Sequence, residues 1–313
     1  MRCTILGGGG FIGSAIVERL LPEGHAVRIL ERPRVLPYRH FDASEQVEWM
    51  AGDLMSAHDV EAAIDGADAV IHLVSTTLPK NSNDDPAYDV QSNLLPTLGL
   101  LDAMVRRQVG RIVFISSGGT VYGASRRLPI DESHPTEPLV SYGIVKLAIE
   151  KYVQMYQRQH GLRGTILRVA NPYGERQRPD TAQGAVGVFL HRALRGEPIE
   201  IWGDGTVARD YLHVADVADA FARALAYTGA ESVFNIGSGS ATSLNDLVAA
   251  IDGLLDRPVE RRHSAARSID VPVNVLDNAL AHRELGWSPQ LSLQEGLART
   301  IAWMRSLPEF RPA

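Results

Sequence analysis

The chain has 313 residues, of which 45% are hydrophobic and 22% are charged, a composition ordinary for a globular protein with a substantial core. Its 37 acidic and 31 basic residues give a formal net charge of −6, which argues against a general binder of nucleic acid or of acidic membranes. The single cysteine, Cys3, excludes an internal disulfide framework. No apolar stretch has the length of a membrane span and none resembles a signal peptide, so we expect a cytoplasmic protein.

The first half of the chain alternates short apolar runs with helical patterns. The runs predicted to be strands are 2–6, 26–30, 69–74, 111–116 and 164–169, and the predicted helices are 11–21, 57–65, 87–108 and 141–160. Parallel strands need a crossover between them, and strands covered on both faces are nearly all apolar. The pattern therefore predicts an α/β fold of the Rossmann type with a doubly wound parallel sheet.

The composition changes after about residue 170, where Pro, Gly and Arg become frequent. Further helices are predicted near 183–195, 214–227, 243–255, 277–285 and 293–307. The segment 211–240 is predicted to return to the main sheet. We expect a Rossmann domain made of 1–170 plus about 211–240, and a smaller C-terminal α/β substrate lobe made of about 171–210 plus 241–313.

A glycine-rich turn, GGGGFIG at 7–13, follows the first predicted strand and opens the first predicted helix. This is the context of a dinucleotide-binding fingerprint, in which glycines let the backbone approach a pyrophosphate at a helix N-terminus. Two spacings fit the fingerprint, either Gly8, Gly10 and Gly13 or Gly7, Gly10 and Gly13.

Charged residues lie at and beyond the end of the second predicted strand. Glu31 ends the second strand, where a carboxylate accepts hydrogen bonds from the adenosine ribose and repels a 2′-phosphate, which favours NAD over NADP. The neighbouring Arg32 is able to hold such a phosphate instead. Asp53, in the AGDL turn at 51–54, either lies near the adenine or simply forms the turn.

Tyr142 and Lys146 have the helical i,i+4 spacing of a Tyr-x-x-x-Lys motif, so both project from one face of the predicted helix. A phenol is a weak base at neutral pH because its unperturbed pKa is about 10. A neighbouring ammonium is expected to lower the pKa of Tyr142 and to make the phenol a usable proton acceptor.

Taken together, these motifs resemble the extended short-chain dehydrogenase/reductase family. The resemblance rests on GGGGFIG, Asp53, HLVS at 72–75, SSGGTVYG at 116–123 and the Tyr142–Lys146 pair. Four later segments resemble the sugar-nucleotide epimerase and dehydratase branch of this family, which includes the UDP-glucose/galactose 4-epimerases. They are NPYG at 171–174, GDGTVARDYLHVADV at 203–217, FNIGSG at 234–239 and LGWSP at 285–289. The resemblance covers nearly the whole chain and implies an NAD-dependent enzyme acting on a nucleotide sugar.

The resemblance also implies roles for individual residues. Tyr142 would take the proton of the sugar 4-hydroxyl and Lys146 would hold the nicotinamide ribose. The other implied cofactor contacts are Phe11, Ile12, Asp53, Leu54, Leu73, Val74 and Ser75, with Asn93 positioning the region of Lys146. The implied contacts to the substrate's nucleotide diphosphate and ribose are Asn171, Arg209, Arg267 and Asp270.

Asn274 stands where galactose-type epimerases of the family often carry a bulky Tyr beside the hexose. A smaller amide there leaves room for an N-acetyl group and offers it a hydrogen bond. The alternative is that Asn274 only turns a loop.

One position departs from the family pattern. Members usually carry a Ser or Thr where this chain has Gly118, and that hydroxyl shares the 4-hydroxyl proton with the Tyr. Thr120 is the expected replacement because it lies two residues further along an extended segment, on the same side. Ser116 and Ser117 are the next candidates.

The resemblance leaves several reactions open. Dehydratases of the family carry an Asp-Glu pair beside the catalytic Thr, whereas this chain has Gly119 and Thr120, which disfavours dehydration. We expect 4-epimerisation of a nucleotide sugar, most simply a UDP-sugar, with a reductase or decarboxylase as the alternative. A non-catalytic NAD(P)-sensing protein is the alternative from another class. Because family members commonly pair helices equivalent to 87–108 and 141–160, we also expect a homodimer.

Overall fold

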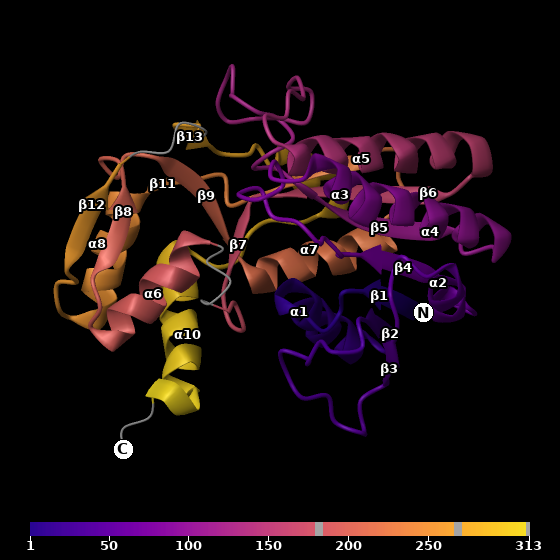
Figure 1. The fold of residues 1–313 in the computed structure, drawn as a ribbon, viewed down its shortest axis with the longest axis horizontal. Coiled ribbons are helices and arrows are strands. Elements are labelled where there is room, and N and C mark those ends of the chain that lie inside the picture. Colours follow the sequence, from indigo (N-terminus) through magenta and orange to yellow (C-terminus); the bar gives the residue numbers. More distant parts are fainter. Residues whose placement is uncertain (179–183, 266–270, 311–313) are drawn as a thin grey trace.

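A computed structural model describes residues 1–178, 184–265 and 271–310. Its largest sheet is fully parallel, with strand order β10-β6-β5-β4-β1-β2-β3 (Figure 1). The strands are β1 (Arg2–Leu6), β2 (Ala26–Glu31), β3 (Val47–Ala51), β4 (Ala69–His72), β5 (Arg111–Ser117), β6 (Arg163–Val169) and β10 (Val233–Ile236). The order reverses between β1 and β4, and ligands of such sheets bind outside the carboxyl ends of the strands at that point.

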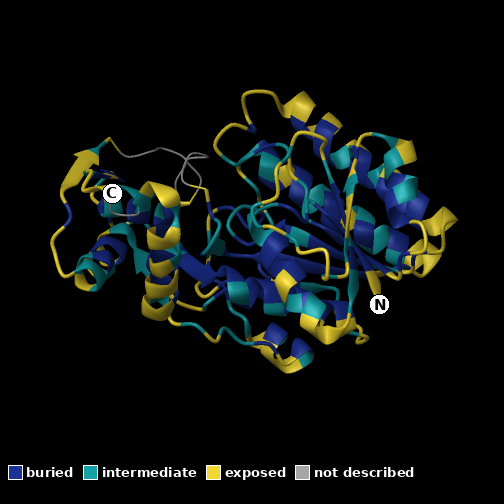
Figure 2. Ribbon diagram, turned by 90° about the horizontal axis from the view of Figure 1, so that it is seen from below, coloured by how far each residue is buried: buried dark blue, intermediate teal, exposed yellow. Residues whose placement is uncertain are grey.

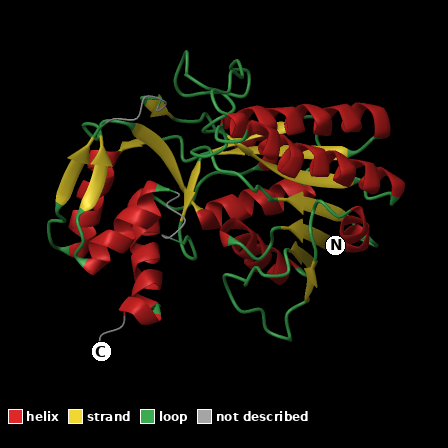
Figure 3. Cartoon of the chain, viewed as in Figure 1, coloured by secondary structure: helices red, strands yellow, loops and turns green. Residues whose placement is uncertain are grey.

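Helices cover both faces of this sheet (Figure 3). One face carries α2 (Ala57–Ile64), α4 (Leu95–Arg106) and α5 (Ser141–His160), and the other carries α1 (Phe11–Leu20), α7 (Val214–Ala226) and α9 (Ala279–Leu285). The short α3 (Pro86–Asp89) and a π-helical turn (Val90–Leu94) lead into α4. The central strands are buried on both sides (Figure 2), which explains why their sequences are apolar rather than alternating.

A smaller lobe has its own apolar core, formed by α6 (Ala185–Arg195), α8 (Leu244–Leu255) and α10 (Leu293–Ser306). In its main sheet β9 (Ala208–His213) pairs with β7 (Asn171–Tyr173), β11 (Ala241–Ser243) and β13 (Val273–Asn274). A second pair joins β8 (Ile199–Trp202) to β12 (Arg261–Ser264). Short 3-10 turns occur at Leu21–Glu23 and Pro308–Phe310.

The predicted strands and helices are confirmed, with three informative differences. The predicted helix 87–108 is divided into α3, the π-helical turn and α4, because Pro96 in the first turn of α4 has no N–H to continue a regular ladder. Residues 211–213 belong to β9 in the small lobe rather than to the main sheet. Finally, α9 packs into the core of the large sheet, where the buried Trp287 indole donates to the Asp216 carbonyl at 3.0 Å.

Within the described residues, no helix combines the length and the apolarity needed to cross a membrane.

Candidate active site

The glycine-rich turn joins β1 to α1 and is shaped for close approach to a ligand. Gly7 has a φ of +85°, and a Cβ on Gly13 would lie only 2.3 Å from the Gly7 carbonyl oxygen. Gly10 is the N-cap of α1, which has neither a side-chain cap nor an acidic residue in its first turn. The amides at this helix end are therefore available to an anion, and the turn fits a dinucleotide pyrophosphate. These features favour the spacing Gly7, Gly10 and Gly13, with Phe11 and Ile12 as the first helical residues.

A carboxylate lies beside this turn at the end of β2. The Glu31 carboxylate accepts backbone hydrogen bonds from Arg32 and Gly9, and burial raises its pKa. The Arg32 side chain is exposed. A fixed carboxylate in this position suits ribose hydroxyls and opposes a 2′-phosphate.

The residues after β3 and β4 continue along the same edge of the sheet. Asp53 accepts the Met55 N–H at 2.9 Å and so does form a turn, while the neighbouring Leu54 is buried. Leu73 and Val74 lie against Gly7, since a Cβ on Gly7 would be 3.4 Å from Val74 Cγ2. Ser75 follows them, with its hydroxyl donating to the Thr77 carbonyl at 3.1 Å.

Tyr142 and Lys146 lie one turn apart at the start of α5. Lys146 Nζ is 5.6 Å from the centroid of the Tyr142 ring and donates to the Ile115 carbonyl at 3.0 Å. The ammonium therefore joins α5 to the carboxyl-terminal half of β5, close to the edge of the sheet that carries the glycine-rich turn.

Burial dominates the acidity of this pair. It raises the pKa of the Tyr142 phenol to about 12, and the negative charge of Asp89 adds to the rise. It lowers the pKa of the Lys146 ammonium to about 8. Burial and the Asp89 carboxylate thus set the direction of the Tyr142 shift, and the lowering expected from Lys146 stays a prediction for the enzyme with its cofactor bound.

The three candidate hydroxyls have different surroundings. Ser116 Oγ is buried and donates to the Glu150 carboxylate. Thr120 Oγ1 is closed off from solvent and has no hydrogen-bond partner among the described residues. Ser117, the last residue of β5, is half-buried.

Packing explains the glycine at position 118. A Cβ there would lie 2.4 Å from Leu276 Cδ1 and 3.1 Å from the Arg168 carbonyl oxygen. Leu276 is fully buried, so it occupies the space that a side chain on residue 118 would need.

Asn93 lies in the π-helical turn that precedes α4 and is buried. Its amide group donates to Asp89 Oδ1 at 2.9 Å, and its carbonyl oxygen accepts the Thr76 N–H at 2.8 Å. Asp89, which is completely buried near Tyr142, was missed by the sequence reasoning. The only signal for it was a carboxylate four residues before Asn93.

Three of the predicted substrate residues lie on neighbouring strands of the small lobe. Asn171 on β7 donates to the Asp210 carbonyl at 3.0 Å, and Arg209 on β9 donates to the Val271 carbonyl at 2.7 Å. Asn274 pairs with Arg209 across β13 and β9. Its amide donates to the Gly118 carbonyl at 3.2 Å and so joins the small lobe to the end of β5. Arg267 and Asp270 lie outside the described residues.

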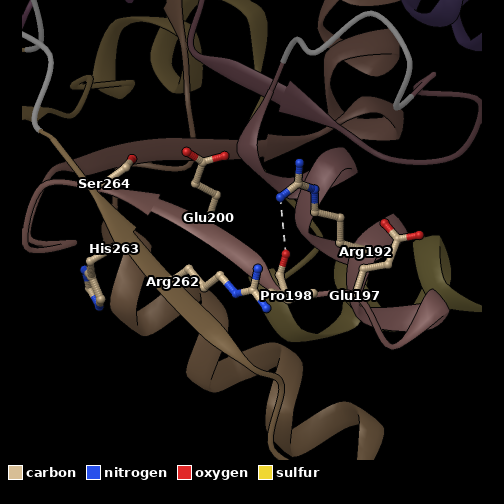
Figure 4. Close-up of a pocket in the computed structure, with 7 residues that line it drawn as sticks. All are labelled: Arg192, Glu197, Pro198, Glu200, Arg262, His263 and Ser264. Atoms are coloured by element: carbon tan, nitrogen blue, oxygen red, sulfur yellow. Dashed lines mark hydrogen bonds between the residues drawn. The ribbon is translucent and has the colours of Figure 1, made fainter.

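A separate surface hollow of about 420 Å³ lies over β8 and β12 in the small lobe (Figure 4). Its lining residues are Arg192, Glu197, Pro198, Glu200, Arg262, His263 and Ser264. Carboxylates stand among the guanidinium groups, so this hollow offers no concentrated positive charge for a phosphate.

Comparisons with known proteins agree with this geometry. A family model described as the NAD dependent epimerase/dehydratase family matches residues 3–237. The UDP-glucose 4-epimerase of Mycolicibacterium smegmatis is 36% identical over 310 residues, which cover 98% of this chain and 99% of that protein.

Solved structures of UDP-glucose 4-epimerases are also similar to this chain over nearly its whole length. The UDP-glucose 4-epimerase of Thermotoga maritima with UDP-glucose has a TM-score of 0.92 at 33% identity, covering 97% of this chain and 99% of that one. The UDP-glucose 4-epimerase of Thermus thermophilus in complex with NAD has a TM-score of 0.90 at 33% identity, covering 98% of this chain and 99% of that one. The resemblance inferred from the motifs is confirmed: the chain belongs to the NAD-dependent epimerase/dehydratase family.

Proposed function

We propose that this protein epimerises a UDP-linked sugar at C4 through a transient 4-keto intermediate, using NAD. The observation that carries the proposal is the position of Tyr142 and Lys146. They lie at the start of α5, against the carboxyl-terminal half of β5, while the glycine-rich turn follows β1 in the same parallel sheet. A proton acceptor and a dinucleotide cradle thus lie at the edge of the sheet where such folds bind ligands.

In this proposal Tyr142 removes the proton of the sugar 4-hydroxyl and Lys146 holds the nicotinamide ribose. The bound NAD supplies the acceptor for the hydrogen of C4. The glycine-rich turn, Phe11 and Ile12 hold its pyrophosphate, and Glu31 holds its adenosine ribose. The remaining cofactor contacts are proposed for Arg32, Asp53, Leu54, Leu73, Val74, Ser75 and Asn93.

The hydroxyl that shares the proton with Tyr142 is proposed to be Ser117. Ser116 is engaged with a buried carboxylate, and Thr120 Oγ1 has no exposed surface through which to meet a sugar. Ser117 is half-buried at the carboxyl end of β5. The closed-off Oγ1 of Thr120 supports choosing Ser117 in place of Thr120, which the spacing alone had suggested.

The small lobe is proposed to bind the nucleotide sugar. Asn171, Arg209 and Asn274 lie on adjacent strands, and a guanidinium matches phosphate oxygens. Arg267 and Asp270 are proposed to complete the grip on the diphosphate and its ribose. Uridine as the base is supported by the UDP-glucose 4-epimerases that resemble this chain.

We also propose a homodimer and a cytoplasmic location, where NAD and nucleotide sugars are available for carbohydrate metabolism. Large apolar side chains are exposed on the helices of one face: Tyr88 is 47% exposed, Leu95 54% and Ile144 56%. Such residues on α3, α4 and α5 suit a helical interface with a second copy.

The test is incubation of the purified protein with UDP-, GDP- and dTDP-sugars, followed by NMR of the products. The proposal predicts interconversion of C4 epimers without net consumption of NAD. Net consumption of NADH or release of CO₂ would identify a reductase or a decarboxylase. Bound NAD without turnover of any sugar would indicate a binding protein.

A further inference from the structure

The helix that carries Tyr142 receives its N-terminal cap from another segment of the chain. Val140, the N-cap residue of α5, makes no side-chain capping bond. Instead Asn83 Oδ1 accepts the Ser141 N–H at 2.9 Å, and Ser141 Oγ donates to Asp89 Oδ2 at 2.7 Å. The residue immediately before Tyr142 is therefore fixed by two hydrogen bonds to the segment that leads into α4.

Asp89 is the centre of this attachment. Its carboxylate is completely buried, and its other oxygen accepts Thr77 Oγ1 at 2.6 Å and Asn93 Nδ2 at 2.9 Å. The three side-chain donors, including Ser141, are neutral. A buried carboxylate satisfied by neutral donors keeps its electric field in a low-dielectric interior.

The π-helical turn brings these groups together. Asp89 ends α3, and Val90–Leu94 continue as a π-helical turn that also carries Asn93. Such turns are rare and occur frequently at functional sites. Here the turn directs Asn93 onto both Asp89 and Thr76.

We infer that Asp89 is a positioning residue that fixes the first turn of α5 and supplies a buried negative charge beside the Tyr142–Lys146 pair. The inference rests on the proposed role of Tyr142 as the base. An acidic side chain outside the motif, on a different helix, thereby adds to the effect of burial on how the motif ionises.

The charged groups around Tyr142 and Lys146 determine in which direction Asp89 shifts the pKa of each. Asp89 raises the pKa of both Tyr142 and Lys146, and the other carboxylate that raises the pKa of Lys146 is Glu150. Glu150 is already paired with Arg168 at 2.6 Å.

On the β4 side, burial lowers the pKa of His72 to about 3, so this imidazole is neutral. Removing the charge of Asp89 must therefore lower the pKa of Tyr142 and move its ionisation to lower pH.

The experiment compares Asp89→Asn with Ser141→Ala in the NAD-loaded enzyme. Asp89→Asn removes the charge and keeps groups able to hydrogen-bond, so the acidic limb of the kcat–pH profile should move to lower pH. Ser141→Ala removes the hydrogen bond from Ser141 Oγ to Asp89 and keeps the charge, so it should lower kcat several-fold and leave that limb in place.

A folded Asp89→Asn enzyme whose acidic limb coincides with that of the wild type would overturn the inference. If Asp89→Asn does not fold, Ser141→Ala and Thr77→Val decide, and wild-type kcat in both would overturn it. Tyr142→Phe separates the inference from the assignment of the base. If Tyr142→Phe is active, Tyr142 is not the base. If Tyr142→Phe is inactive but the acidic limb of Asp89→Asn coincides with that of the wild type, only the positioning role of Asp89 is refuted.

Discussion

Restoring a serine at position 118 tests whether packing, rather than chemistry, excludes a side chain there. A Cβ on Gly118 would lie 2.4 Å from Leu276 Cδ1 and 3.2 Å from Leu276 Cδ2. Carbon atoms prefer about 3.5–4.0 Å, so the Leu276 methyls must move by about 1 Å. Because Leu276 is fully buried, we expect Gly118→Ser to cost about 1–3 kcal/mol of unfolding free energy, as overpacked cores do.

The same contact predicts a favourable coupling. Leu276→Ala alone leaves a cavity and should cost about 2–5 kcal/mol. In the double variant the new serine fills part of that cavity, so the combined loss should fall at least about 1 kcal/mol short of the sum of the single losses.

Urea unfolding at one fixed concentration of protein and NAD measures all four forms, since bound ligand adds to apparent stability. Gly253→Ser is the matched control, because a Cβ on this exposed residue of α8 would meet nothing within 4 Å. Full stability of Gly118→Ser, or strict additivity in the double variant, would refute the packing argument.

Substitutions in the site and on the proposed interface give four more expected outcomes. Tyr142→Phe should retain NAD, measured by absorbance of the purified protein, and lose about 10²–10⁴-fold in turnover. Ser117→Ala should lower kcat at least about tenfold, or about 1.4 kcal/mol, while Thr120→Val should be nearly silent, and the opposite result would assign the hydroxyl to Thr120. UDP-N-acetylhexosamines should be used at least as well as UDP-hexoses by kcat/KM, with Asn274→Tyr impairing the N-acetylated substrates selectively; equal losses would make Asn274 a structural residue. Ile144→Asp should convert a dimer to a monomer in light scattering, and a monomeric wild-type protein would contradict the proposed interface.

The fold was predictable because its signals are local and repeated. Apolar runs with covered faces, such as 111–116, and the helical period of 141–160 do not depend on distant contacts. The position of α9 was not predictable, because it depends on Trp287 finding the Asp216 carbonyl on α7, a contact between distant parts of the sequence.

The site divides in the same way. The glycine-rich turn and the Tyr142–Lys146 spacing are visible in the sequence because each lies within a few consecutive residues. The burial that raises the pKa of Tyr142 and the contact of Leu276 with Gly118 depend on residues far apart in the sequence. Asp89 escaped notice for the same reason, since its bond to Ser141 spans 52 residues.

The central claim is that C4 loses and regains the same hydrogen through a 4-keto sugar. The most direct measurement uses UDP-glucose carrying deuterium at C4, incubated with the enzyme in ordinary water and followed by NMR. The account predicts UDP-galactose that keeps its deuterium at C4, because that hydrogen stays on the enzyme during the turnover. Loss of the deuterium to solvent, with epimerisation proceeding, would contradict it.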